Sequence, residues 1–340
     1  MRQPGCARAQ VWASLASLAA LASLAAAAGC ATGGDASTGG AAGPGGARNA
    51  PDDRDLVGVV PAGPETVLEI DLGQLRDSPW SRGLLQARSE DERQARRLAL
   101  GYDELVDVDR MLFAVTEDAA GPLVLTISQG RFTADAVGRG FAGAHPGATA
   151  DPWRGSPLWR SGQEATALVT PRTLVSGRLD SVRGAIDCAF GLAPDARGGG
   201  LGPLRRAMEP ERGRPALVAA VAVTEAMRQR VGGEFQLPEG LHHAGARLDL
   251  GAALDVSLLA LHERPQQAEA AARLAQQFLV DLRGRTLLRV FGLGPLLDGA
   301  SFHAEGTRLR GQLHIPESER ADLAQKITLI LETLRRARSR

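Results

Sequence analysis

One short stretch of this sequence has the spacing of a nucleotide-binding motif. "GRGFAG" (Gly138 to Gly143) matches G-x-G-x-x-G, in which glycines let a phosphate approach a helix N-terminus. That chemistry needs the glycines in the turn that leaves a strand. Here we expect a strand to end near Ser128 and a helix to begin at Thr133, so the glycines fall at the end of that helix. We interpret them as stop signals and close-packing residues, and predict no nucleotide and no other cofactor.

A second stretch, "YDELVDVDR", concentrates carboxylates and raises the question of a calcium loop. An EF-hand needs oxygen ligands at alternating positions, a central glycine and a closing glutamate. This stretch has apolar residues between its acids and no glycine. We therefore predict a solvated, acid-rich approach to a strand. Its acids are Asp103, Glu104, Asp107 and Asp109.

The histidines do not have the spacing of a metal site. None forms H-E-x-x-H, and none pairs with a cysteine at zinc-binding spacing. His303 and His314 both point outward on the last hairpin, roughly 20 Å apart along the ladder. His242 and His243 are expected on opposite sides of one strand. We predict no metal site; the six histidines are His145, His242, His243, His262, His303 and His314.

No catalytic nucleophile can be identified from the sequence. G-x-S-x-G is absent, and no serine has a histidine or aspartate context that predicts a triad. A hydrolase whose triad forms only in space stays an alternative. It would require a serine or aspartate within reach of His243, His262 or His303.

Composition narrows the possible partners. The 340 residues have a formal net charge of zero, so no electrostatic attraction to nucleic acid is expected. Aromatic residues make up only 4%, which leaves few rings for stacking on sugars or bases. Trp153 and Trp159 could expose a ring pair to a ligand, but we expect them to cap their own hairpin.

The order of strand and helix patterns repeats along the chain. Alternating and 3.6-residue periodicities predict two strands, a helix, two or three strands and a helix before the Gly-rich break at 195–203. Two strands, a helix, two strands and a helix follow it. The sequence therefore predicts an α+β fold with two similar modules, 58–198 and 199–340, each a mainly antiparallel sheet with helices packed on one face.

These patterns place the individual elements. In the first module strands are expected at 65–72, 110–117, 121–130, 157–161, 164–170 and 172–177, and helices at 78–85, 89–100, from Thr133 and at 180–192. In the second, hairpins are expected at 243–263 and 300–315, with a helix from Pro265 and another from about Glu317. The Pro265 helix has an apolar stripe formed by Ala271, Leu274, Phe278 and Leu282.

The N-terminal segment has the pattern of a secretory leader. Arg2 and Arg8 precede an uncharged run of mostly alanine, leucine and serine from Val11 to Ala28. Gly29 and Cys30 follow this run. From there to residue 57 the chain is rich in Gly, Ala, Ser, Thr and Pro, which predicts a flexible tether that spans roughly 25–30 Å.

Ala27-Ala28-Gly29-Cys30 resembles the lipobox of bacterial lipoproteins, although Ala27 stands where leucine is usual. The resemblance implies that residues 1–29 are a lipoprotein signal peptide and that Cys30 becomes the acylated first residue. With Ala31 after the cysteine, it also implies delivery to the outer membrane. Leader, tether and module style loosely resemble uncharacterised lipoproteins of high-G+C proteobacteria such as myxobacteria, from which no activity carries over. The alternative is cleavage after Ala28 by ordinary signal peptidase, which would release the protein.

The other cysteines predict no disulfide. Cys6 lies in the leader, and Cys188 is the only cysteine left in the folded part. No histidine is near Cys188 in sequence, so we predict a small buried hydrophobic residue on a helix.

These patterns favour a lipid-anchored protein of the cell envelope without catalysis, on the periplasmic or surface face of the outer membrane. Its partners would be the membrane, through the lipid on Cys30, and a protein or other envelope component. An anchored or periplasmic hydrolase and a secreted small-ligand binder are the alternatives. The C-terminal "LRRARSR" could touch anionic headgroups or simply complement its helix dipole.

Overall fold

The structure is a computed structural model, and it describes residues 56–81, 90–118, 121–209, 214–231, 237–284, 294–323 and 325. The contacts divide the chain into two compact units. The N-terminal unit consists of the described residues within Ala28–Gly73 and Arg88–Pro203. The C-terminal unit consists of those within Gln74–Ala87 and from Leu204 onward. A short early segment thus belongs with the second half of the chain, which the sequence analysis does not predict.

The N-terminal unit contains an antiparallel sheet in the order β1-β2-β3-β7-β6-β5-β4. Its strands are β1 (Thr66–Asp71), β2 (Val108–Asp118), β3 (Gly121–Gly130), β4 (Thr149–Ala150), β5 (Leu158–Ser161), β6 (Glu164–Thr170) and β7 (Thr173–Arg178). Its helices are η1 (Leu56–Val59), α4 (Glu90–Leu100), α5 (Glu104–Asp107), α6 (Ala134–Ala144), α7 (Leu179–Ala189) and η2 (Ala196–Gly198).

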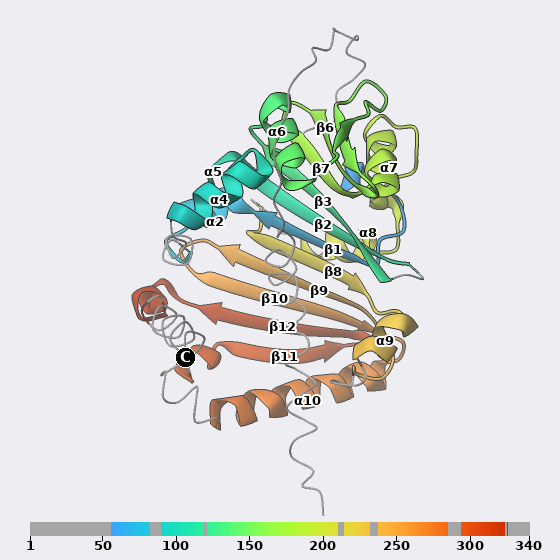
Figure 1. Ribbon diagram of the computed structural model, residues 1–340. Coiled ribbons are helices and arrows are strands. Elements are labelled where there is room, and N and C mark those ends of the chain that lie inside the picture. The colour runs from blue at the N-terminus through green and yellow to red at the C-terminus, as the bar shows by residue number, and fades with distance from the viewer. Residues whose placement is uncertain are drawn as a thin grey trace, which may run out of the picture. The chain divides into compact units, whose positions relative to one another are not determined.

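Helices cover both faces of this sheet. Leu168 and Leu174 are paired across β6 and β7 and pack with Val137 of α6. Ala167 and Val175, the neighbouring pair, point to the other face, and α7 packs against β6 and β7. Figure 1 shows α6 and α7 on either side of these strands. The sequence analysis predicts helices on one face; the second layer forms because β6 is apolar on both sides.

The C-terminal unit contains five antiparallel strands, in the order β11-β12-β10-β9-β8. Its strands are β8 (Leu217–Ala222), β9 (Leu241–Leu250), β10 (Leu254–His262), β11 (Ala300–Glu305) and β12 (Arg308–Ile315). Its helices are α9 (Glu225–Val231), α10 (Pro265–Gly284), η3 (Pro295–Leu297) and η4 (Glu317–Glu319). Helices α2 (Leu72–Asp77) and α8 (Gly202–Met208) contain the unit boundaries.

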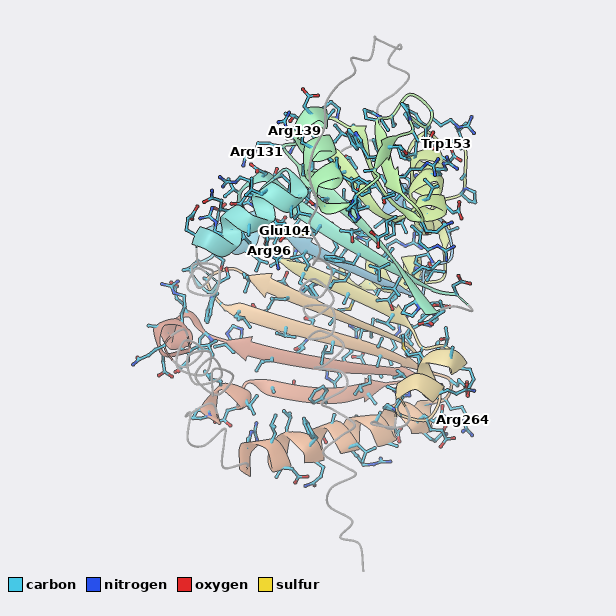
Figure 2. All side chains as sticks on the ribbon, in the orientation of Figure 1. Arg96, Glu104, Arg131, Arg139, Trp153 and Arg264 are labelled. Carbon is cyan, nitrogen blue, oxygen red and sulfur yellow. The ribbon has the colours of Figure 1, made fainter. Side chains whose placement is uncertain are left out.

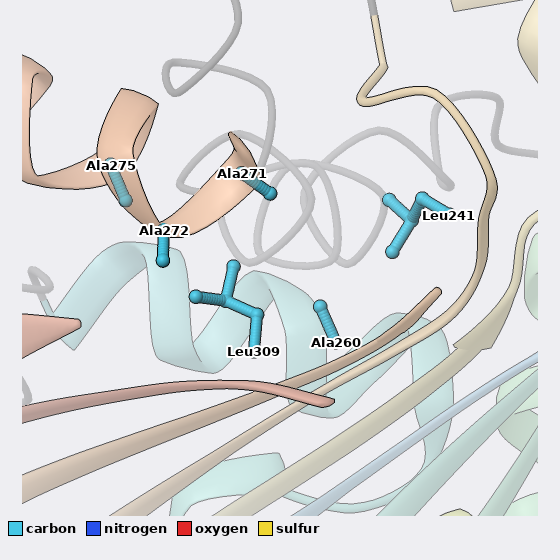
Figure 3. Packing of buried hydrophobic residues seen from close by; sticks show 6 residues of the cluster. All are labelled: Leu241, Ala260, Ala271, Ala272, Ala275 and Leu309. Atoms are coloured by element: carbon cyan, nitrogen blue, oxygen red, sulfur yellow. The ribbon is translucent and has the colours of Figure 1, made fainter. Parts of the chain in front are cut away.

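Helix α10 packs on the apolar face of this sheet through alanines. Ala271, Ala272 and Ala275 are buried against Ala260 and Leu309 (Figure 3). Figure 1 shows α10 running along β11. The small side chains let the helix approach the sheet closely. The stripe predicted from the sequence is therefore partly wrong.

The correction concerns Leu274, which the predicted stripe includes. Its side chain is 44% exposed, because it lies on the helix side away from the sheet. Phe278, another member of the stripe, packs against the alanine cluster as predicted.

At the other end of the same sheet face, the sheet is covered by Trp80, which belongs to the Gln74–Ala87 segment. Trp80 packs with Leu296 and Ile315, and its Nε1–H donates to the carbonyl oxygen of Gly251 at 3.2 Å. Residues 78–81 form a turn rather than the start of the helix predicted at 78–85, whose remaining residues lie outside the described ones.

The α+β class and the mainly antiparallel sheets are confirmed. Both units also share a topology: a three-stranded meander, a helix, and a hairpin whose last strand pairs with the third strand of the meander. In the first unit this is β1-β2-β3, α6 and β6-β7; in the second it is β8-β9-β10, α10 and β11-β12. Strands β4 and β8 are missing from the sequence prediction.

Candidate functional site

Three histidines gather at one corner of the C-terminal unit. The register between β9 and β10 shifts between Leu261 and His262, so that His242 is an extra residue in a β-bulge. The rings of His242 and His243 are 5.0 Å apart, centroid to centroid, in an edge-to-face arrangement. The prediction that these two face opposite sides of a strand is wrong, because the bulge interrupts the alternation.

The third histidine of this corner, His262, is fully buried at the end of β10. Its Nδ1 lies 3.3 Å from the carbonyl oxygen of Glu239, and its Nε2 is buried without a hydrogen-bond partner. Burial lowers the pKa of His262, and the neighbouring His242 and Arg228 lower it further, against the effect of the Glu239 carbonyl. We call His242, His243 and His262 the histidine corner.

The described residues supply neither a metal cluster nor a serine triad. No group of three or more His, Cys, Asp or Glu side chains within them is arranged to hold a metal ion. Among the same residues, no hydrogen bond joins a serine hydroxyl to a histidine ring; His314, for example, bonds to Asp255 through Nδ1 at 2.6 Å.

The hairpin of β11 and β12 presents an exposed polar surface. Leu309 and Ile315 point to the buried face as predicted, while the polar side chains point away from it. We call this surface the outer polar face; its residues are Asp255, Ser301, His303, Glu305, Arg308, Arg310, Gln312 and His314.

Charged side chains of the outer polar face form ion pairs, with the exception of one arginine among the described residues. Arg310 pairs with Glu305 at 2.9 Å, and His303 lies 3.6 Å from the same carboxylate. His314, 60% exposed, pairs with Asp255. Arg308 is exposed and has no ion-pair partner among the described residues.

The outer polar face brings His303 and His314 closer than predicted. His303 lies opposite Arg310, four positions along β12 from His314, or about 14 Å. The predicted distance of roughly 20 Å is too long, although about 14 Å still prevents the two rings from sharing a metal ion.

β11 is the outermost strand of this sheet, and the Gln276 side chain of α10 donates to the carbonyl oxygen of Phe302 at 2.8 Å. This contact occupies one backbone acceptor of β11 that could otherwise pair with another chain.

The glycines of "GRGFAG" lie inside α6 and serve packing. A Cβ on Gly138 would lie 2.7 Å from Nε1 of Trp159, and one on Gly140 would lie 2.4 Å from the backbone nitrogen of Gly101. The close-packing prediction is confirmed for Gly138 and Gly140 but not for Gly143, where a Cβ would meet no atom within 4 Å. The interpretation of the glycines as stop signals is wrong, because the helix continues to Ala144, beyond Gly143.

The acidic stretch organises the contact between α4 and α5. Asp103 is buried, caps α5 by accepting from the Leu105 N–H at 3.0 Å, and pairs with Arg93 and Arg97 at 2.9 and 3.0 Å. Burial raises the pKa of Asp103, but the hydrogen bonds from Arg93, Arg97 and Leu105 outweigh it and the pKa is lowered.

The second acid of this stretch, Glu104, pairs with Arg96 at 2.8 Å, and the two side chains lie together in Figure 2. The carboxylate of Asp103, the most buried of the stretch, already has two arginines and a backbone N–H as partners. The stretch is therefore a structural ion-pair cluster. The prediction of a solvated approach is wrong for Asp103.

The two tryptophans serve different contacts. Trp159 packs in the cluster beneath α6, with Phe132 and Leu168. Trp153 donates from Nε1 to Asp187 at 3.2 Å, and the guanidinium of Arg183 lies 4.5 Å from its ring centroid. They form no exposed ring pair.

Of the three cysteines, Cys188 lies within the described residues. Cys188 is buried on α7 as predicted, and burial, followed by Asp195 and Asp187, raises its pKa to about 11. A thiol with that pKa stays protonated and unreactive at neutral pH. Cys30 and the C-terminal "LRRARSR" lie outside the described residues.

Comparisons with known proteins give a likeness of fold. No family model and no curated protein matches the chain. Among solved structures, crystal form IV of TP0453 is similar over 79% of this chain and 96% of its own, with a TM-score of 0.47 and 14% identity. Crystal form III covers 80% and 98%, with a TM-score of 0.49 and 13% identity. No functional argument follows from likenesses at this level.

Proposed function

We propose that this chain is a lipid-anchored protein of the cell envelope that binds a partner protein through the outer polar face. The anchor rests on the sequence: the leader with its uncharged run, Cys30 at the end of the leader, and the tether that follows. Acyl chains on Cys30 would hold the folded part at a membrane, because burial of more than one chain gives stable attachment. The proposed location is the outer membrane. No described helix is long and apolar enough to span a membrane.

The outer polar face is the observation that carries the binding role. It is a stretch of sheet that remains exposed, although the opposite face of the same strands is buried under α10. Exposed polar side chains on a rigid sheet can recognise a partner with little loss of conformational entropy. The unpaired Arg308 adds a cation whose natural complement is a carboxylate.

The chemistry of this face favours a protein partner. Cations and carboxylates alternate along it, as Arg310 and Glu305 show, which suits the mixed charges of a protein surface. A glycan would be recognised through aromatic stacking, but Phe302, the aromatic residue of β11, packs on the α10 side. We therefore assign an envelope protein that offers a carboxylate to Arg308.

The two exposed histidines of the face provide a test. Diethyl pyrocarbonate modifies accessible imidazoles, and His303 and His314 are 47% and 60% exposed. In envelopes of the cell that makes the protein, we expect modification of both to fall several-fold relative to the purified full chain, as measured by mass spectrometry.

The variant Arg308→Glu should restore modification in the envelope, because it repels the partner's carboxylate. Arg273→Glu is the control: it reverses an arginine of α10 that is 70% exposed, outside the face, and should retain the protection. Equal modification in envelopes and in solution, or protection that survives Arg308→Glu, would contradict the proposal.

A further inference from the structure

The protonation state of His262 follows from its surroundings in the C-terminal unit. The side chain is 1% exposed, and the backbone N–H donates to the carbonyl oxygen of Thr307 at 2.9 Å. The contact of Nδ1 with the Glu239 carbonyl assigns the ring proton to Nδ1 of a neutral imidazole. Nε2 is buried and has no partner. A second proton on this ring would therefore have no acceptor.

The charged groups that act on the His262 ring, His242 and Arg228, both lower its pKa. Arg228 of α9 donates to the carbonyl oxygens of Pro238 and Leu241, beside the strand that pairs with His262. The positive end of the α10 dipole begins three residues after His262. The charged or titratable residues on the surrounding elements are His242 and His243 (β9), Arg228 (α9), Glu239, Glu263 and Arg264 (before α10), and Arg308 (β12).

The nearby carboxylates offer little compensation. The Glu239 side chain is 85% exposed and lies 3.3 Å from the Arg264 guanidinium, so it is already paired and in water. Glu263 is exposed. A charge on His262 would thus be buried, unpaired and close to other cations, which is an expensive state.

The loop before β9, next to the histidine corner, contacts the start of α10. The Glu263 N–H donates to the carbonyl oxygen of Gly240 at 3.0 Å, and Ala268, in the first turns of the helix, is fully buried. A Cβ on Gly240 would lie 2.1 Å from the Gln267 side chain, so the loop before β9 and the helix start are in close contact. Opening of the corner would therefore release the first turns of α10.

We propose that the histidine corner is an acid-sensitive latch, which keeps the start of α10 on β9 and β10 while His262 is neutral and opens when His262 takes up a proton. The buried, unpartnered Nε2 supplies the trigger. The backbone contacts between Gly240 and Glu263 are the part that separates. The latch is independent of whether the outer polar face binds a partner.

The direction of the pH dependence follows from the histidine pKa values. Burial, and then His242, lower the pKa of His243, and the pKa of His262 is lowered too. At a pH above the ordinary histidine value of about 6.5, both closed and open states carry neutral rings and the latch is stable. Below it, only the open state takes up protons readily, so the closed state loses stability as the pH falls.

Hydrogen–deuterium exchange of the full-length protein tests the latch. The amides of His262, Glu263 and Ala268 are hydrogen-bonded across or next to the corner. After correction for intrinsic exchange rates, we expect the equilibrium constant for opening at these amides to increase about tenfold between pH ~7.5 and pH ~5.5. The factor of ten is expected for one ring that takes up a proton in the open state and stays neutral in the closed state. Unchanged opening at these amides would overturn the proposal.

Two variants separate His262 from other titrating groups. His262→Phe keeps a ring of similar size without a titrating nitrogen, and should reduce the pH response by about tenfold. His303→Phe removes an exposed histidine of the same unit and should keep the full response. A full response in His262→Phe would contradict the latch.

A measurement on the unmodified protein covers the case in which His262→Phe does not fold. The Cε1 proton of His262, followed by NMR, should titrate below the ordinary histidine pKa of about 6.5. Titration of His262 at or above that ordinary value would show that the closed corner accommodates the charge, which excludes the latch.

Discussion

Gly140→Ala should destabilise the N-terminal unit by about 2–3 kcal/mol. The added Cβ would lie 2.4 Å from the Gly101 nitrogen and from the Leu100 carbonyl carbon, and backbone atoms cannot rotate away. Helix α6 would have to move away from α4, which costs more than the helix propensity that alanine adds. Urea unfolding, followed through hydrogen exchange of the α6 amides, measures the change.

Gly143 supplies the matched control in the same helix. A Cβ there meets no atom within 4 Å, and the position is exposed. Gly143→Ala should therefore stabilise α6 by about 0.5–1 kcal/mol through backbone entropy alone. Similar effects of the two substitutions would contradict the packing role assigned to the motif.

Asp103→Ala should cost about 2–3 kcal/mol. The substitution removes the cap of α5 and leaves Arg93 and Arg97 without the buried carboxylate that they share. Asp118→Ala is the control, because Asp118 is exposed and forms a surface pair with Arg178, which is worth less than about 1 kcal/mol. Urea titration of each variant gives the difference. An Asp103 variant as stable as the Asp118 variant would show that the cluster is solvated after all.

The same carboxylate makes the N-terminal unit sensitive to acid. The pKa of Asp103 is lower in the folded state than the ordinary aspartate value, since its hydrogen bonds with Arg93, Arg97 and Leu105 outweigh burial. Its contribution is therefore complete above the ordinary value of about 3.9 and is lost as the pH falls through the folded pKa. Asp103→Ala should flatten the acid limb of the stability curve.

The strands could be predicted from the sequence where one face is buried and the other is exposed to solvent. In β12, buried residues such as Leu309 alternate with outward residues such as Arg310. This period of two residues is the pattern of a strand with one buried face, and it also determines which residues point inward. β8 has no such contrast: its residues are leucine, valine and alanine, apolar on both faces, and a short apolar run without alternation does not distinguish a strand from a buried helix segment. The bulge at His242 depends on pairing with β10, which the sequence of β9 alone does not encode.

The side-chain clusters depended on contacts between distant residues. The role of Gly140 could be expected from its spacing, but its partner Gly101 could not, because the two are joined only by the crossing of α4 and α6. Asp103 pairs with Arg93 and Arg97, which are four residues apart on α4 and therefore lie on one side of the helix, so the spacing of the two arginines is a signal that the sequence does contain. The outer polar face could be predicted in part, from the alternation of β12.

The anchor on Cys30 is the central claim, and intact mass together with membrane partitioning tests it most directly. The protein and its Cys30→Ser variant are expressed in a Gram-negative host, and each is weighed and sedimented with the membranes. We predict that the unmodified protein begins at Cys30, carries the mass of the acyl chains and sediments with the membrane, while the Cys30→Ser variant carries no lipid mass and does not sediment with the membrane. Soluble proteins in both cases, beginning at or before Ala31 with a free thiol in the unmodified protein, would contradict the anchor and favour a secreted binder.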